Sequence, residues 1–113
     1  MKFLVEETEL KINKGLSLIY FYAPWVSFHK KVLEYLVAAE NNCSDIVFYG
    51  VNIDQFKQMA ARFKVASLPT AIITKDGGKT VKYVVGIRAL SKIDEIIADI
   101  YIKHQGDMNA EKS

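Results

Sequence analysis

The sequence predicts an α/β domain built on a mixed β-sheet, and three observations carry that prediction. Residues 16–22 form a charge-free run rich in Leu, Ile and aromatic residues, as in a strand buried on both faces. After a short break, apolar residues recur at spacings of three and four as far as Glu40, which is typical of an amphipathic helix. The same order of strand and helix then recurs along the chain, so we expect helices on both faces of the sheet.

Length and composition fit one domain. The chain has 113 residues, half of them hydrophobic, which is enough to bury a core. We expect a single domain over residues 1–104 and a disordered tail over residues 105–113, which are almost without apolar side chains. The formal net charge is only +2 and no basic cluster stands beside aromatics, so we expect no nucleic-acid partner.

No segment predicts contact with a membrane. The longest charge-free stretch, residues 15–28, is too short to span a bilayer and contains Pro24. Acidic residues follow Met1 within a few positions, so no apolar signal region is expected there. A cytoplasmic location without a membrane partner is the expectation that follows.

The first half of the chain predicts two strands around the long helix, after a short N-terminal part. Residues 2–5 can form an edge strand, and residues 6–13 can make two turns of helix that end at Gly15. Ser27 is the expected N-cap of the long helix. Residues 46–52, which include Val, Phe and Tyr, have a strong preference for a strand.

The second half predicts a short helix, a hairpin and a last helix. Asp54 is the expected N-cap of the short helix. Strands over residues 70–74 and 80–85 are joined by a turn that contains two glycines. Ser91 fits a capping box at the start of the last helix, which loses its apolar face near His104.

Four segments, in this order, resemble thioredoxins. Residues 20–30 resemble the family's active-site segment, in which an apolar strand leads to Ala-x-Trp-Cys-Gly-Pro-Cys-Lys. Residues 51–54 resemble the end of its third strand, residues 63–70 the approach to its cis-proline, and Gly86 the glycine that lines its peptide groove. The resemblance covers residues 16–103 and implies the thioredoxin fold, a central mixed β-sheet flanked by helices on both faces.

The chain departs from this family where the chemistry should occur. Positions 26–29 read Val-Ser-Phe-His instead of Cys-Gly-Pro-Cys. Disulfide exchange needs one thiolate to attack and a second thiol to resolve the mixed disulfide. The family's buried acid falls on Tyr20, and the lysine paired with it falls on Gly50. We therefore expect no catalytic residue and no enzymatic dithiol–disulfide exchange at this site.

The resemblance instead predicts a redox-inactive protein that binds a protein or an extended peptide, as an adaptor, chaperone-like module or complex subunit. Trp25 is the expected aromatic anchor, beside an apolar patch on the loop that follows it. The backbone of Leu68 would pair with the partner as a short β-augmentation. The competing interpretation is that the loop has repacked inward and the patch is packing surface. The candidate partner-binding residues are Trp25, Val26, Ser27, Phe28, Leu68, Pro69, Gly86 and Ile87.

Ser27 and His29 offer a hydroxyl and an imidazole, but catalysis by this pair is not expected. Residues two apart on a helix point in different directions, and no third residue is evident to orient the imidazole. His29 is interpreted as a packing residue near a helix N-terminus, which disfavours its charged form. The two histidines are far apart in sequence, so we expect no metal site and no cofactor.

The single cysteine, Cys43, leaves two alternatives open. One thiol cannot form an internal disulfide and fits a reducing compartment. Cys43 could serve a thiol–disulfide role in redox homeostasis, although the nearby Asp45 would raise its pKa. The other alternative is a structural module that forms a homodimer through the apolar patch. A monomer or a weak homodimer is expected.

Overall fold

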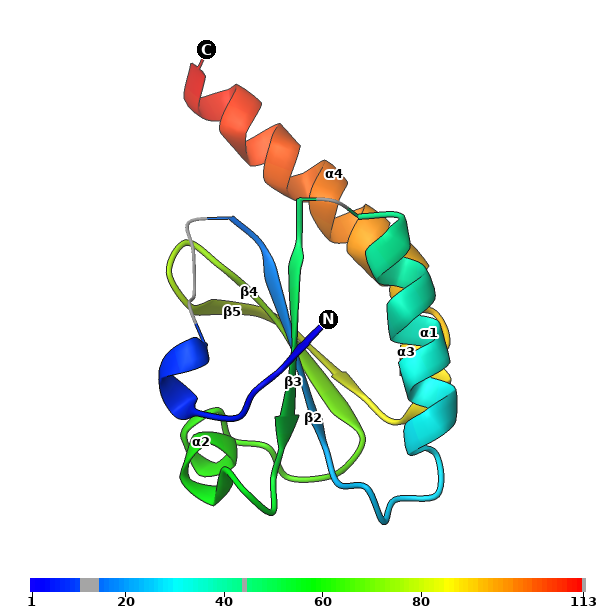
Figure 1. Cartoon of the computed structure of the whole chain (residues 1–113). Helices are drawn as coiled ribbons and strands as arrows, with labels where there is room; N and C mark the ends of the chain where they lie inside the picture. Colours follow the sequence, from blue (N-terminus) through cyan, green and yellow to red (C-terminus); the bar gives the residue numbers. More distant parts are fainter. Residues whose placement is uncertain (11–14, 44, 113) are drawn as a thin grey trace.

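The computed structural model describes residues 1–10, 15–43 and 45–112, with side chains described as far as residue 103. Its centre is one five-stranded sheet in the order β1-β3-β2-β4-β5. The strands β1, β3 and β2 run parallel, while β4 and β5 run antiparallel to their neighbours (Figure 1). The strands are β1 (Lys2–Phe3), β2 (Ser17–Tyr22), β3 (Val47–Asn52), β4 (Thr70–Lys75) and β5 (Lys79–Val85).

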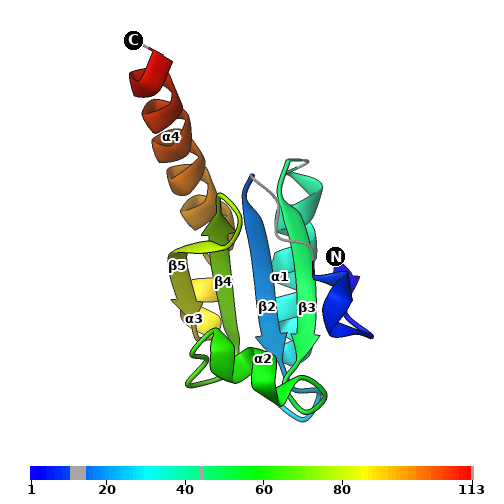
Figure 2. The same ribbon diagram turned by 90° about the vertical axis from the view of Figure 1, so that its left-hand side faces the viewer.

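Helices cover both faces of this sheet. The helices α1, α3 and α4 lie on one face, and α2 lies on the other with the short 3₁₀ helix η1 (Figures 1 and 2). The predicted mixed sheet with helices on both faces is therefore confirmed. The helical elements are η1 (Glu7–Glu9), α1 (His29–Asn41), α2 (Lys57–Arg62), α3 (Ile87–Leu90) and α4 (Ile93–Lys112).

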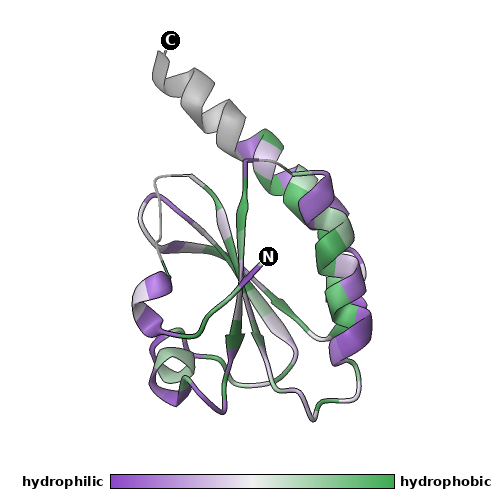
Figure 3. Cartoon of the chain, in the orientation of Figure 1, coloured by the Kyte–Doolittle hydropathy of each residue, from purple (hydrophilic) through white to green (hydrophobic). Residues whose placement is uncertain are grey.

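The strand β2 contributes to the core on both sides, as the charge-free run predicts. Leu18 and Tyr20 belong to the apolar cluster on the α1 and α4 side. Ile19 and Phe21, which alternate with them, belong to the cluster on the α2 side. All four side chains are fully buried. Figure 3 shows the apolar residues along the central strands and on α1.

Strand direction brings four loops together along one edge of the sheet, the edge formed by the ends of the strands and not by an outer strand. The strands β2 and β3 end side by side, where Tyr22 pairs with Asn52. Because β4 runs the other way, it begins at the same edge, and β5 ends beside it where Val85 pairs with Thr70. The loops after β2, β3 and β5 and the loop before β4 therefore meet there. We call this edge, at the bottom of Figure 1, the loop edge.

The predicted cap at Ser27 is wrong. The helix α1 begins at His29, and its N-cap is Phe28, which makes no side-chain capping bond. A backbone turn precedes it, because the His29 N–H donates to the Val26 carbonyl at 3.1 Å. This turn satisfies a donor that a capping hydroxyl would otherwise serve, so the helix starts later than the cap rule predicts.

Two further caps differ from the predictions. The helix α2 has Phe56 as its N-cap, so Asp54 is not the cap. Ser91 is the C-cap of α3, and its hydroxyl donates to the Arg88 carbonyl at 2.6 Å. The predicted capping box at Ser91 is wrong because a separate short helix, α3, ends there directly before α4. No apolar period in the sequence indicates so short a helix.

The ends of the chain also differ in part. The strand β1 lies at the sheet edge as predicted but spans only Lys2–Phe3. In the described part of the predicted helix over residues 6–13 the structure has only η1, and residues 11–13 lie outside the described residues. The helix α4 continues to Lys112, so the predicted end near His104 is wrong. Helix formation propagates cooperatively, and that segment needs no apolar face to extend an existing helix.

Candidate functional site

Trp25 is an exposed but anchored aromatic residue on the loop edge. Its side chain is 71% exposed in the loop between β2 and α1. The indole N–H donates a hydrogen bond to Asp54 Oδ2 at 2.9 Å, and the Asp54 N–H donates to Asn52 Oδ1 at 2.9 Å. Asp54 thus holds the Trp25 ring from the loop after β3. A fixed ring loses less conformational entropy when it meets a partner.

The side chains after Trp25 keep apolar surface in the open. Phe28 is 49% exposed, and Val26 is partly buried. The Val26 N–H donates to the Ala23 carbonyl at 3.1 Å, which closes a tight turn around Pro24. Phe28 has therefore not turned into the core, whereas Val26, the other residue that the competing interpretation could turn inward, is partly buried. Ser27 is exposed between the two apolar residues.

The segments before β4 and after β5 are joined at the same edge. The Leu68–Pro69 peptide bond is cis, and Pro69 is buried while Leu68 is half-buried. The Gly86 N–H donates to the Pro69 carbonyl at 2.9 Å. Within the described residues, the backbone N–H and C=O of Leu68 make no backbone hydrogen bond. Leu68 therefore keeps one donor and one acceptor for another chain.

Gly86 stands where the backbone requires a glycine. Its φ angle is +90°, and a Cβ added to it would meet no atom of the chain within 4 Å. Backbone angle, not crowding by neighbours, is thus the constraint. Ile87 follows at the start of α3 and is half-buried against the cluster on the α1 side. The space beside Gly86 is open to an approaching chain.

Three cavities among the described residues lie away from the loop edge. Cavities of about 670, 450 and 450 Å³ lie beside α4, beside Cys43 and between α2 and the β4–β5 hairpin. None of these three is lined by Trp25, Phe28 or Pro69. The candidate site at the loop edge is therefore distinct from each of these three cavities.

His29 is held by two tyrosines of β2. Its ring stacks on Tyr22 with centroids 4.6 Å apart and lies nearly parallel to Tyr20 at 5.9 Å. Tyr20 Oη lies 3.0 Å from His29 Nδ1. Burial raises the pKa of the Tyr20 hydroxyl and lowers the pKa of His29. Both shifts favour the uncharged forms, and the two groups share a hydrogen bond whose direction depends on which ring nitrogen carries the proton.

The contact between Tyr20 and His29 was not predicted from the sequence. Tyr20 orients His29, whereas we expected no residue to do so. The signal was present, because Tyr20 and Tyr22 lie two apart on a strand and share the face that packs against α1. The Nδ1 atom engaged by Tyr20 is not available to Ser27 as a base, which removes the simplest form of a Ser–His pair.

Phe3 explains why a glycine stands at position 50, where the family has a lysine. Tyr20 pairs with Gly50 across β2 and β3, as expected for the positions that hold the family's acid and lysine. A Cβ at Gly50 would lie 2.5 Å from Cδ1 of Phe3. The Phe3 ring also meets Tyr22 edge to face at 5.8 Å. An aromatic ring from β1 thus covers Gly50, and stacked aromatic side chains replace the charged pair.

The His29 environment predicts a dependence of stability on pH. The folded state lowers the pKa of His29, so the unfolded chain binds a proton at this residue more readily than the folded protein does. The domain therefore has its full stability above the unfolded pKa of about 6.5, and it loses stability as the pH falls toward the folded pKa. We expect His29→Phe to lose less stability than the wild type between about pH 7.5 and pH 5. Urea unfolding followed by circular dichroism at both pH values measures this. Equal losses in the two proteins would contradict the prediction.

Cys43 lies away from the loop edge. It follows the C-terminal end of α1, whereas His29 begins that helix. Burial raises the pKa of the Cys43 thiol, and the charge of Asp94 raises it further. The acid that raises the pKa of Cys43 is thus Asp94. From proximity in the sequence we expected Asp45. A raised pKa leaves little thiolate at neutral pH, which disfavours a nucleophilic role.

The fold and the site together define a thioredoxin-fold protein whose loop after β2 lacks the two thiols. The family model described as Thioredoxin matches residues 4–99. A thioredoxin of Chlamydia caviae is 36% identical over 86 residues, covering 76% of this chain and 83% of its own. A thioredoxin of Staphylococcus aureus is 33% identical over 90 residues, covering 77% and 84%. This chain belongs to the thioredoxin family.

Solved structures agree with the fold. Oxidised mitochondrial thioredoxin 3 of Saccharomyces cerevisiae matches with a TM-score of 0.76 at 23% identity, covering 88% of this chain and 94% of its own. The thioredoxin of Trypanosoma brucei brucei matches with a TM-score of 0.77 at 20% identity, covering 88% of each. The present chain has one cysteine and none at positions 26–29, so the loop lacks the thiol pair that dithiol exchange requires.

In the described part of the chain, each helix is too short or too polar to span a bilayer. No three His, Cys, Asp or Glu side chains in the described part of the chain are grouped so as to hold a metal ion.

Proposed function

We propose that this chain is a redox-inactive member of its family that binds an extended segment of a protein partner at the loop edge. The observation that carries the proposal is Trp25, which is 71% exposed and yet fixed by a hydrogen bond to Asp54 at 2.9 Å. Tryptophan is enriched among the residues that dominate binding energy at interfaces. An anchored, exposed tryptophan beside Phe28 is what such an interface needs before the partner arrives.

Backbone groups support an extended partner. The N–H and C=O of Leu68 are without a backbone partner in the described part of the chain. An extended segment can bond to both, as in β-augmentation. The open space beside Gly86 leaves room for that segment, and Val26 and Phe28, on another loop of the same edge, offer apolar surface. Affinity would come from the backbone bonds and selectivity from the apolar contacts.

The test is retention of a partner from native cell extract by the immobilised chain, with reductant present. Wild type is compared with the double variant Trp25→Ala, Val26→Asp. Loss of a tryptophan anchor costs about 2 kcal/mol or more, so we expect retention to fall about thirtyfold. Asp54→Ala removes the hydrogen bond to the Trp25 indole but keeps the ring, so retention of the partner should fall less than in the double variant.

Val37→Asp is the matched control for the acidic change. Val37 is exposed on α1, away from the loop edge. This variant should retain the partner as well as wild type does. Circular dichroism shows whether each variant is folded before it is used. A partner that binds the double variant as tightly as wild type would refute the proposal.

The two alternatives from the sequence have their own tests. A one-thiol role predicts thiol-dependent activity that Cys43→Ser abolishes, and the raised pKa of Cys43 disfavours it. A homodimer through the same surface predicts a mass that rises with concentration in light scattering. A concentration-independent monomer would remove that alternative and leave the loop edge free for a different protein.

A further inference from the structure

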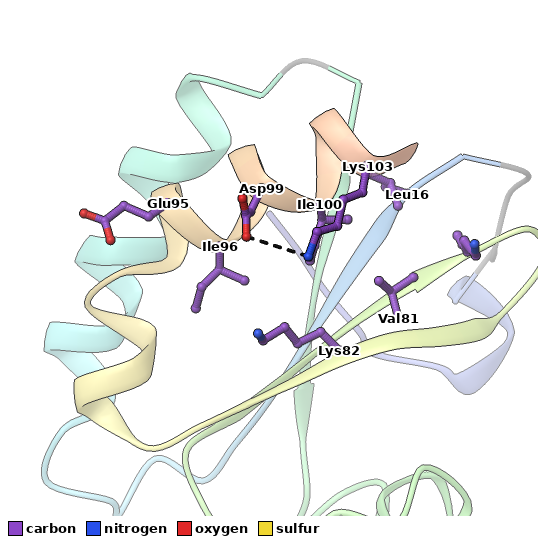
Figure 4. A pocket seen from close by; sticks show the side chains of 9 residues that line it. Leu16, Val81, Lys82, Glu95, Ile96, Asp99, Ile100 and Lys103 are labelled. Carbon is purple, nitrogen blue, oxygen red and sulfur yellow. Dashed lines mark ion pairs between the residues drawn. The ribbon is translucent and has the colours of Figure 1, made fainter. Parts of the chain in front are cut away.

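A cavity lies at the other end of the molecule, between α4 and the β4–β5 hairpin (Figure 4). Its volume is about 670 Å³, which lies within the range of small-molecule sites. Leu16, just before β2, lines it, whereas Trp25 lies beyond the other end of that strand. The cavity is therefore separate from the loop edge and is not part of the proposed partner site.

The floor of this cavity is apolar. Leu16 and Ile100 are buried, and Ile96 and Val81 are partly exposed beside them. In Figure 4, Ile96 points from α4 into the space above β5. Apolar surface of this kind favours a hydrocarbon group over water.

A β-bulge sets a cation next to that floor. The pairing of β4 with β5 shifts between Ile73 and Thr74, so Val81 is an extra residue on β5. Successive residues of a regular strand point to opposite faces, but here Val81 and Lys82 both line the cavity. The bulge thus places an apolar and a charged side chain in one site. Bulges are enriched beside functional sites because they re-aim side chains in this way.

Positive charge exceeds negative charge around the cavity. Lys75, Lys82 and Lys103 line it, against Glu95 and Asp99. Lys103 and Asp99 form an ion pair at 4.0 Å between exposed side chains, which is weak and easily exchanged. Lys75 and Lys82 form no ion pair with any described residue. Two ammonium groups are therefore available to an anion above an apolar floor.

We propose that this cavity binds a small amphipathic organic anion, a carboxylate with an apolar tail. The tail would lie on Leu16, Ile96 and Ile100, and the carboxylate would accept hydrogen bonds from Lys82 and Lys75. Both parts of such a ligand match a feature of the site, whereas an inorganic anion would use only the lysines. A neutral chain of the same length would use only the floor.

The experiment titrates the ¹⁵N-labelled chain with sodium decanoate and follows amide chemical shifts. We expect saturable shifts confined to β5, the start of β2 and α4. Decanol and inorganic phosphate are titrated in parallel and should each bind at least about tenfold more weakly. Shifts centred on Trp25 and Phe28, or no saturation, would overturn the proposal. Equal binding of decanol or of phosphate would overturn it too, because one half of the recognition would then be absent.

Variants locate the site independently. Lys82→Glu should weaken decanoate binding about tenfold or more, since it replaces an attractive charge by a repulsive one. Lys57→Glu makes the same charge change on the opposite face of the sheet and should leave the affinity unchanged. Lys82→Gln serves as the milder variant and should weaken binding in the same direction. Equal affinities of Lys82→Glu and Lys57→Glu would overturn the assignment.

Discussion

Replacing Tyr20 by alanine should destabilise the domain by about 3–5 kcal/mol, the usual cost of removing a large buried aromatic side chain. Tyr20 is fully buried on β2 and stacks on Tyr22 with centroids 5.4 Å apart. Its loss would leave a cavity in the core and remove the hydroxyl that bonds His29. Urea unfolding at neutral pH, followed by circular dichroism, measures the change in the free energy of unfolding.

Tyr20→Phe separates packing from hydrogen bonding in that result. The ring remains and only the hydroxyl is lost, so we expect a cost of about 1 kcal/mol. A cost for Tyr20→Ala close to that of Tyr20→Phe would show that the ring contributes little. The aromatic group would then not be a structural substitute for the family's charged pair.

Replacing Gly86 by alanine should cost about 1–3 kcal/mol and weaken partner binding at the loop edge. The φ angle of +90° is one that side chains of L-residues rarely adopt. Relief of the strain would displace the Gly86 N–H from the Pro69 carbonyl and shift Ile87 at the start of α3. Urea unfolding gives the stability, and the retention assay described for Trp25 gives the binding.

Gly15→Ala is the matched control. Gly15 has no φ angle in the positive range, and a Cβ there would also meet nothing within 4 Å. We expect its effect to stay within about 0.5 kcal/mol. If both substitutions cost the same, backbone conformation would not be the reason for a glycine at position 86.

Local pattern was sufficient to predict the order of the main strands and helices and the lack of a thiol pair after β2. The period-two burial of β2 and the three- and four-residue spacing in α1 are properties of neighbouring residues, so they can be read without a structure. The absence of cysteine at positions 26–29 is likewise a matter of composition. The mixed sheet and the exposure of Trp25 and Phe28 followed from these patterns and from the family resemblance.

The helix caps were predicted wrongly because several groups compete for the same hydrogen bonds, and sequence rules do not compare them. Ser27 and Asp54 are both good capping residues, yet neither caps a helix. A backbone turn supplied the bond that Ser27 would have made, and Asp54 accepts the Trp25 indole N–H instead. Each polar group has several possible partners, and packing of distant segments selects among them.

The fold of this chain, its buried central strand and its lack of a thiol pair could be read from residues that are neighbours in the chain and from the family resemblance. Three contacts could not be read in this way: Asp54 holds Trp25, Tyr20 orients His29, and Phe3 covers Gly50. The bulge in β5 that sets Lys82 beside an apolar floor was not predictable from the sequence either. These features join residues far apart in the chain, and their geometry depends on how helices and strands pack, which no local period encodes.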